Sequence, residues 1–314
     1  MKYVDLHCDT LTKSFDEELC LKDGGLQINL DKLKKSGCAA QCFAIFTDGE
    51  RSAERFENCL AFYREQTDKN NGRVLPVLNY SDLLNCINGN SLGAILTVEN
   101  LGFIGKDLSR LDKLKSVGVK MASLVWNFEN ALAYPNLKFK DGMPLFSERE
   151  ERGLTKLGAE AAEKLDALKI ILDISHLSDG GAEQLLKGRK IPIVASHSNA
   201  QAVCGVCRNL SDGLIKKIAD CGGVVGVNFC VDFVGGNGGR EMLLKHIRHI
   251  ISVGGEDIIA LGSDFDGIPE NSDIKDCTAM PKLFDFLNMR GISSAVLEKL
   301  AYKNFVRVFK EVCG

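Results

Sequence analysis

The sequence predicts an α/β protein folded as a (β/α)8 TIM barrel. Eight short apolar runs, rich in β-branched residues, recur from one end of the chain to the other, and helix-like amphipathic segments separate them. Most of these runs are apolar almost without interruption, which is typical of parallel strands buried on both faces. Eight β/α units in 314 residues fit a closed barrel.

The predicted strands follow one another at intervals that leave room for a helix between most of them. Segments 52–70 and 153–169 show the helical period most clearly. A further apolar run, 74–80, contains Pro76 and is expected at an edge. The eight barrel strands are expected at 3–7, 39–46, 93–99, 119–126, 170–176, 192–198, 223–229 and 257–264.

A doubly wound open sheet is the main alternative to the barrel. Such a sheet normally carries a glycine-rich phosphate loop after its first strand, whereas Cys8-Asp9-Thr10 follows the first predicted strand here. We find no repeat, no low-complexity tract and no linker rich in Pro, Ser or Gly. Residues 1–314 are therefore expected to form a single catalytic barrel domain.

Composition excludes several classes of function. The net charge of −3 does not indicate a nucleic-acid surface, and no apolar run approaches the ~20 residues of a membrane span. The N-terminus lacks the apolar core of a signal peptide. Twelve cysteines are scattered through apolar segments, and a single CxxC pair, Cys204 and Cys207, cannot form a four-cysteine zinc cage. We expect reduced thiols in a cytoplasmic protein.

Polar residues collect where the predicted strands end. In a barrel of this kind, the carboxyl ends of the strands meet at one mouth, where catalysis takes place. Only five histidines occur in the chain, and three of them lie at these ends. The residues concerned are His7 and Asp9, Glu99, Asp173 and His176, His197, and Asp264 and Asp266.

Histidine and carboxylate side chains together form the ligand set of zinc or a similar divalent metal. The number of candidates exceeds what one ion needs and favours two ions roughly 3.5–4 Å apart that share a carboxylate. Glu99 is the expected bridge, because its strand lies between those that supply the two histidine groups. Taken singly, each His could be structural, and Asp173 or Asp266 could simply be a helix N-cap. The other two histidines, His246 and His249, have helical spacing and are expected to pack outside the barrel.

Five ordered motifs, DLHCDT, TVEN, LDISH, IVASHSN followed by RN, and GSDFDG, resemble the membrane (renal) dipeptidase family of zinc metallopeptidases and its bacterial members. The resemblance extends from Asp5 to the helical segment 304–312. It implies a metal-dependent hydrolase barrel that holds two zinc ions and cleaves dipeptides. It also implies the roles of individual residues: His7 and Asp9 on the first ion, Glu99 as the bridge, His176 and His197 on the second ion, Arg208 on the substrate carboxylate, and Asp264 as the catalytic acid and base.

One position departs from the family pattern. Many members carry a histidine after the fourth strand that contacts the substrate, and Trp126 stands there in this chain. An indole N–H can donate a hydrogen bond but cannot carry a positive charge. Trp126 and the adjacent Asn127 are expected to contact the substrate, and Asn100 and Asn130 are further candidates for the pocket wall.

The expected chemistry is hydrolysis of a dipeptide by a hydroxide that bridges two metal ions, with Asp264 moving the proton to the leaving amine. A bidentate grip of Arg208 on the free carboxylate, close to the metals, would restrict the substrate to very short peptides. Two alternatives stay open: another binuclear hydrolase that acts on lactones, cyclic amides or phosphotriesters, and a metal-binding barrel without catalysis. The sequence leaves the oligomeric state open, a homodimer included.

Overall fold

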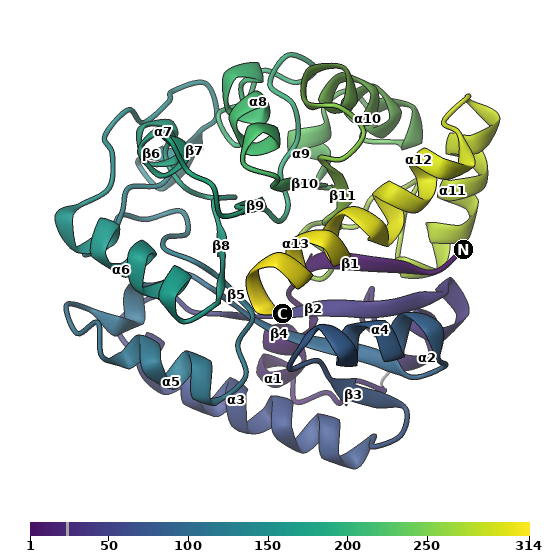
Figure 1. The fold of residues 1–314 in the computed structure, drawn as a ribbon, viewed down its shortest axis with the longest axis horizontal. Helices are drawn as coiled ribbons and strands as arrows, with labels where there is room; N and C mark the ends of the chain where they lie inside the picture. The colour runs from purple at the N-terminus through teal and green to yellow at the C-terminus, as the bar shows by residue number, and fades with distance from the viewer. Residues whose placement is uncertain (23–24) are drawn as a thin grey trace.

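A computed structural model describes residues 1–22 and 25–314, and its central feature is a parallel sheet closed into a barrel (Figure 1). The sheet order is β2-β1-β11-β10-β9-β8-β5-β4-β3, and a long parallel pairing of β2 with β4 closes the ring. The predicted (β/α)8 barrel is therefore confirmed. The strands are β1 Tyr3–Cys8, β2 Cys38–Phe46, β3 Val74–Pro76, β4 Leu92–Glu99, β5 Met121–Ser123, β8 Ile171–Asp173, β9 Val194–Ala195, β10 Val224–Val227 and β11 Ile259–Leu261.

All eight predicted barrel strands are present, but those in the second half are shorter than their apolar runs. The run 192–198, for example, contains only the two-residue strand β9 before the chain leaves the ladder. The additional strand predicted near Pro76 is β3, which pairs with the first residues of β4. A small antiparallel hairpin of β6 (Lys138–Lys140) and β7 (Met143–Leu145) follows β5 and was not predicted.

Helices surround the barrel, and the side chains at their N-caps explain where several of them begin. Asn29, Asn79, Thr155, Ser178 and Ser211 each accept a hydrogen bond from a backbone N–H in the first turn. The helices are α1 Thr10–Asp16, α2 Leu30–Ser36, α3 Ser52–Lys69, α4 Tyr80–Asn88, η1 Leu101–Ile104, α5 Arg110–Ser116, α6 Lys156–Ala167, α7 Asp179–Leu186, α8 Asp212–Asp220, α9 Val231–Val234, α10 Arg240–Gly254, η2 Cys277–Ala279, α11 Met280–Met289, α12 Ser294–Glu298, η3 Lys299–Lys303 and α13 Asn304–Cys313.

The C-terminal helix α13 lies across the barrel strands (Figure 1). Its apolar face, including Phe305, Val308 and Phe309, is buried in one cluster with residues of the barrel strands such as Val4 and Leu6. Burial of this apolar face is favourable by about 25 cal/mol per Å². The helix thus covers the interior of the barrel on the side away from the polar strand ends. No helix in the described residues is long and apolar enough to cross a membrane.

Candidate metal centre and substrate pocket

The polar side chains predicted from the strand ends converge at one mouth of the barrel. His7, in β1, and Asp9, just after it, approach each other with 3.3 Å between His7 Nε2 and Asp9 Oδ2. His176 follows β8 and His197 follows β9, and their Nε2 atoms lie 2.9 Å apart. These histidines are almost completely buried, so their ring nitrogens face one another and the carboxylates rather than bulk solvent.

Glu99 lies between the two groups and reaches both. Its Oε1 is 2.8 Å from His176 Nε2 and 3.7 Å from His197 Nε2. Its Oε2 is 3.6 Å from His7 Nε2. One carboxylate thus directs each oxygen to a different pair of ligand candidates, which is the geometry of a bridging ligand in a two-metal site.

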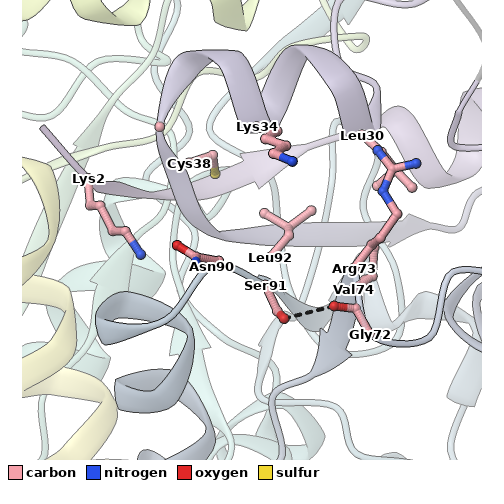
Figure 2. Close-up of a pocket in the computed structure, with 11 residues that line it drawn as sticks. Lys2, Leu30, Lys34, Cys38, Gly72, Arg73, Val74, Asn90, Ser91 and Leu92 are labelled. Atoms are coloured by element: carbon pink, nitrogen blue, oxygen red, sulfur yellow. Dashed lines mark hydrogen bonds between the residues drawn. The ribbon is translucent and has the colours of Figure 1, made fainter.

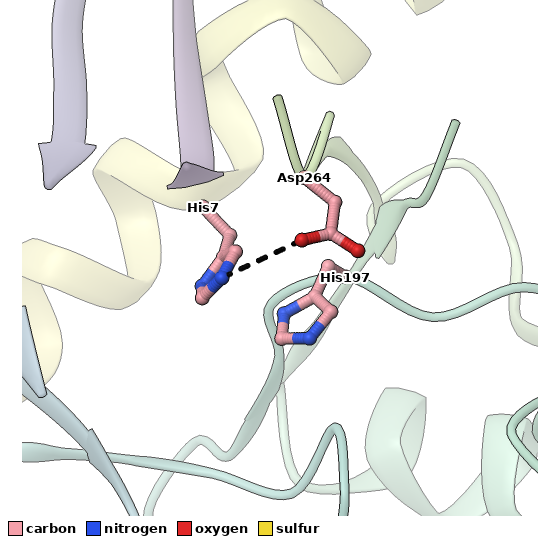
Figure 3. Close-up of side chains that lie close together, drawn as sticks. All are labelled: His7, His197 and Asp264. Atoms are coloured by element: carbon pink, nitrogen blue, oxygen red, sulfur yellow. Dashed lines mark ion pairs between the residues drawn. The ribbon is translucent and has the colours of Figure 1, made fainter. Parts of the chain in front are cut away.

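Among the described residues, three overlapping groups of side chains could each hold a metal ion. Within each group, the ligand atoms all lie within 4.8 Å of one another. The first group is Glu99, His176 and His197, and the second is His7, Asp9 and Glu99. The third joins His7 and His197 to Asp264, with 3.7 Å between His7 Nε2 and Asp264 Oδ1 (Figure 3). Figure 3 shows the three side chains pointing toward a common space from separate segments of the chain.

The hydrogen bonds of His176 show that this space fits a cation. His176 Nδ1 lies 2.9 Å from Oδ1 of Asn127, which can only accept, so Nδ1 carries the ring proton and Nε2 a lone pair. That lone pair faces Oε1 of Glu99 and Nε2 of His197. Electron-rich atoms held this close, and buried, are favourable only with a cation or a proton among them.

The pKa values of the clustered side chains are shifted by burial and by the charges of neighbouring groups. Burial favours a neutral His7 ring, but Glu99 and Asp9 outweigh it and raise the pKa of His7 to about 10. Burial also raises the pKa of Asp264 to about 7 and the pKa of Glu99 well above its usual range. Burial lowers the pKa of His176 and that of His197, and nearby positive charge adds to the effect.

Asp264 is held in an uncommon backbone conformation at the edge of this cluster. Its φ of 64° lies in the left-handed region, which Asp tolerates better than most residues but still at a cost. Its Oδ2 accepts a hydrogen bond of 2.8 Å from the side chain of Asn228, which follows β10. These constraints leave Oδ1 directed toward His7 and the space between the ligand groups.

Arg208 is buried beside the cluster, with 2% of its surface exposed. Its guanidinium donates to the backbone oxygen of Ser175, and another of its nitrogens lies 3.2 Å from His176 Nε2. Nε has no partner among the described residues, and no carboxylate of this part of the chain forms an ion pair with Arg208. Arg208 is therefore not part of a surface salt bridge among the described residues.

A cavity of about 440 Å³ opens onto the group of metal-ligand candidates and is lined by Arg208, Trp126 and Asn127. Trp126 forms part of its wall and packs edge-on against Phe46, with 4.7 Å between ring centroids. Asn127 lines the same cavity while holding His176 through its oxygen. The lining also includes Asp9, Glu99, His176, Asp264, Cys230, Phe233 and Gly267.

A larger cavity of about 550 Å³ lies at the opposite end of the strands (Figure 2). It is lined by Lys2, Cys38 and Leu92, where β1, β2 and β4 begin, together with Lys34 and Arg73. Its lining contains no His, Asp or Glu, and Figure 2 shows its basic side chains spread around the rim. The ligand chemistry is therefore confined to the carboxyl ends of the strands in the part of the chain that is described.

Comparison with known proteins agrees with this geometry. A model of the membrane dipeptidase family, peptidase family M19, matches residues 1–313. The chain belongs to the membrane dipeptidase family. It is accordingly a metallopeptidase of the M19 type, and the resemblance inferred from the five motifs is confirmed.

Two solved structures resemble this M19 chain over almost its whole length. One is a metallo peptidase from Rhodobacter sphaeroides, liganded with a phosphinate mimic of the dipeptide L-Ala-D-Ala, with a TM-score of 0.90, 26% identity and 99% of both chains covered. The other is dipeptidase AC, an M19 metallo peptidase, with a TM-score of 0.93 and 26% identity over 100% of this chain and 99% of that chain.

Curated relatives include a Klebsiella pneumoniae protein described by its position in the pqqA 5′ region, 32% identical over 259 residues, 81% of this chain and 94% of its own length. A dipeptidase of Schizosaccharomyces pombe, itself uncharacterized, is 31% identical over 230 residues, 71% of this chain. The alignment covers 54% of that yeast protein, so the chain spans about half of its length.

Several polar residues of the M19 chain take structural roles. Asp5 shares the strand parity of His7, but both of its oxygens accept hydrogen bonds from Ser263. Asp266 is not an N-cap: it accepts hydrogen bonds from Thr10 and from the backbone of 27–28. His246 is buried in α10 and bonds the backbone of 200 and 234, as expected for a packing residue. Asn100 and Asn130 bond each other and nearby backbone groups and do not line the cavity.

Sequence reasoning missed three parts of the site. Asn228, the partner of Asp264, directly follows the seventh predicted strand, so a survey that included that strand end would have found it. Gly267 lies against Asp9, and only its place after GSDFD in the motif hinted at a role. Phe46 ends β2 and supports Trp126, but an apolar residue at a strand end carries no recognisable signal.

Proposed function

We propose that the protein is a zinc-dependent dipeptidase whose single catalytic domain, residues 1–314, holds two zinc ions. The observation that carries this proposal is the position of Glu99, whose two oxygens face two separate pairs of ligand candidates. His7 and Asp9 are assigned to the first ion, His176 and His197 to the second, and Glu99 to both. When bound, the ions supply Lewis acidity that lowers the pKa of water and polarises the peptide carbonyl.

The protein groups then orient the substrate and move its protons. Asp264 Oδ1 faces the cluster, and a carboxyl group whose pKa is raised to about 7 is suited to accept a proton from water and return it to the leaving amine. The indole N–H of Trp126 and the side-chain amide of Asn127 are the proposed donors to the substrate. Asn127 can serve both purposes, because its oxygen holds His176 while its nitrogen has no partner in the described residues.

The buried guanidinium of Arg208 supports a substrate with a free carboxylate. A charge in this position, with Nε lacking a partner, is stabilised when a carboxylate enters the cavity and accepts its hydrogen bonds. The cavity of about 440 Å³ fits a ligand no larger than a short peptide. The dipeptide mimic bound to the Rhodobacter sphaeroides relative gives independent support.

No cysteine of the described residues is joined in a disulfide, and most of the twelve are buried. A chain with this many cysteines and no disulfide in its described part is suited to a reducing environment. We therefore propose the cytoplasm as its location.

The test is turnover of a panel of dipeptides by protein of known metal content, beside a lactone, a cyclic amide and a phosphotriester. We expect about two zinc ions per chain and activity on dipeptides alone. Asp264→Asn should keep the metal and lose about 10²–10⁴-fold in kcat, the usual contribution of a general acid–base. Asp257→Asn removes an exposed carboxylate paired with Lys299 and should leave kcat unchanged. Two bound zinc ions without turnover of any dipeptide would overturn the proposal.

A further inference from the structure

A buried carboxylate next to the metal-ligand candidates has no role in the proposed mechanism. Asp173 ends β8 and is 6% exposed, yet it belongs to none of the groups of metal-ligand atoms. Its Oδ1 accepts hydrogen bonds from the backbone N–H of Ser175, the hydroxyl of Ser175 and the backbone N–H of Ser196. Its Oδ2 accepts the hydroxyl proton of Ser196. Both oxygens are thus occupied by the protein itself.

The hydrogen bonds of Ser196 connect this carboxylate to a metal-ligand candidate. Ser196 Oγ lies 2.8 Å from Nδ1 of the adjacent His197. A serine hydroxyl has one proton, and Ser196 donates it to Asp173. The neighbouring Ser175 cannot supply another, because its own proton goes to Asp173 as well. Ser196 Oγ can therefore only accept from His197, which places the imidazole proton on Nδ1.

We propose that Asp173 and Ser196 form a relay that holds the proton of His197 on Nδ1 and so presents the Nε2 lone pair to the metal. The proposal rests on the proposed function for the identity of His197 as a ligand. Both residues are positioning residues, since neither faces the cavity. Partners of this kind fix the ring orientation of metal-binding histidines and raise their basicity.

The two histidines assigned to the second ion thus have different hydrogen-bond acceptors at Nδ1. His176 donates its Nδ1 proton to the neutral amide oxygen of Asn127, at 2.9 Å. His197 donates to a hydroxyl that is itself polarised by a carboxylate. Because hydrogen bonds in a chain polarise one another, and this chain ends on a carboxylate, the relay makes His197 the more firmly oriented of the two.

Asp5 and Ser263 form a similar Asp–Ser pair that makes no hydrogen bond to an imidazole ring of the described residues. Asp5 in β1 accepts the hydroxyl proton and the backbone N–H of Ser263, just as Asp173 does with Ser196. Both pairs are buried and both join neighbouring strands. Ser263 Oγ, however, contacts no histidine ring nitrogen in the described chain. Ser263→Ala is therefore the control for the loss of a buried Asp–Ser hydrogen bond.

Asp173→Asn should reverse the direction of the relay. Two backbone N–H groups require an oxygen at the Oδ1 position, so the new amide nitrogen must face Ser196. That nitrogen donates to Ser196 Oγ, and the hydroxyl then turns its proton toward His197 Nδ1. The imidazole proton moves to Nε2, where it blocks metal binding, as in the wrong-tautomer effect of an Asp-to-Asn change in a catalytic triad.

The first experiment reads the tautomer of His197 in the full-length protein, zinc-loaded and after chelation. Selective nitrogen-15 labelling of five histidines gives few signals, and His197→Ala assigns the relevant one. We expect the Nδ1–H tautomer in both states of the wild type and the Nε2–H tautomer in chelated Asp173→Asn. An Nε2–H tautomer in the chelated wild type overturns the proposal even if the variant does not fold.

The second experiment measures zinc affinity by competition with a chelator. Asp173→Asn and Ser196→Ala should each weaken binding of one ion by about 10–100-fold, the usual effect of removing such a partner. Ser263→Ala should leave the affinity for the ion assigned to His176 and His197 unchanged, because Ser263 Oγ contacts neither of these rings. Equal losses in all three variants would reduce the relay to a general packing effect and overturn it. Neither readout depends on catalysis, so a wild type that cleaves no dipeptide but shows the Nδ1–H tautomer disproves the proposed function alone.

Discussion

Gly267 packs so closely against Asp9 that a Cβ atom on Gly267 would lie 2.0 Å from Asp9 Oδ2 and 3.0 Å from Asp264 Oδ1. Side chains cannot approach to 2.0 Å, so any larger residue at this position must displace the Asp9 carboxylate. The proposed metal site therefore requires glycine at position 267, although glycine itself offers no ligand atom.

Gly267→Ala should weaken binding of the ion assigned to His7 and Asp9 by at least about tenfold, comparable to the loss of a partner of a metal ligand. The fold should survive, because the contact involves the end of a side chain and the backbone has room to keep its path. Zinc titration of the purified variant checks the prediction. Gly205→Ala is the control, since a Cβ there meets no atom within 4 Å. Unchanged zinc affinity in Gly267→Ala would contradict the geometry of Asp9.

Zinc binding should release protons near pH 6. The pKa of His7 is raised to about 10 by Glu99 and Asp9 against the effect of burial, and burial raises the pKa of Asp264 to about 7. The metal-free site therefore holds protons at pH 6 that its ligand form must lose, and the apparent affinity should rise with pH. Calorimetry in two buffers of different ionisation enthalpy measures the release. Identical enthalpies in both buffers would show that no protons leave.

Metal removal should destabilise the protein more at pH 7.5 than at pH 5.5. Burial raises the pKa of Glu99 and of Asp264 above the unfolded values, so these groups stabilise the metal-free fold at low pH and lose that contribution as pH rises toward 7. Bound zinc reverses the trend, because it prefers the ionised carboxylates. The difference in melting temperature between zinc-loaded and chelated protein should widen with pH. A difference in melting temperature that does not change with pH would contradict the placement of Glu99 and Asp264 at the metal site.

Arg208→Lys should lower kcat/KM for dipeptides by at least about tenfold, because an ammonium cannot replace the two-pronged grip of a guanidinium on a carboxylate. The decisive measurement compares a dipeptide with its C-terminal amide. Wild type should strongly prefer the free acid, and the variant should lose most of that preference. A preference that survives the substitution would mean that another group binds the carboxylate.

Trp126→Phe should separate the two roles of the indole. The Phe ring retains the edge-on packing against Phe46, at 4.7 Å in the wild type, but has no N–H. If the indole donates to the reacting carbonyl, kcat should fall by roughly 10²–10³-fold with little change in KM, as for the loss of one oxyanion donor. A change confined to KM would show that Trp126 only shapes the cavity wall.

The barrel and the convergence of the candidate site residues at its mouth follow from the sequence. Buried parallel strands appear as apolar runs, and the closure of the barrel brings their carboxyl ends together, so His7, Glu99 and His197 are expected to meet although about 90 residues or more separate each from the next along the chain. The hairpin β6–β7 could not be predicted in this way, since its two short strands carry no sustained alternation.

The sequence by itself determined which polar residues could belong to the site, and the tertiary structure decided which of the acids face it. Asp173 and Asp264 lie at strand ends and Asp5 lies within β1, yet Asp5 and Asp173 are held by serines next to neighbouring strands. Ser263, the partner of Asp5, is 258 residues away along the chain, and no local pattern reveals such a contact. Only the tertiary structure shows that the oxygens of such a carboxylate already accept hydrogen bonds from the protein. The carboxylate can be placed outside the metal site only on that basis.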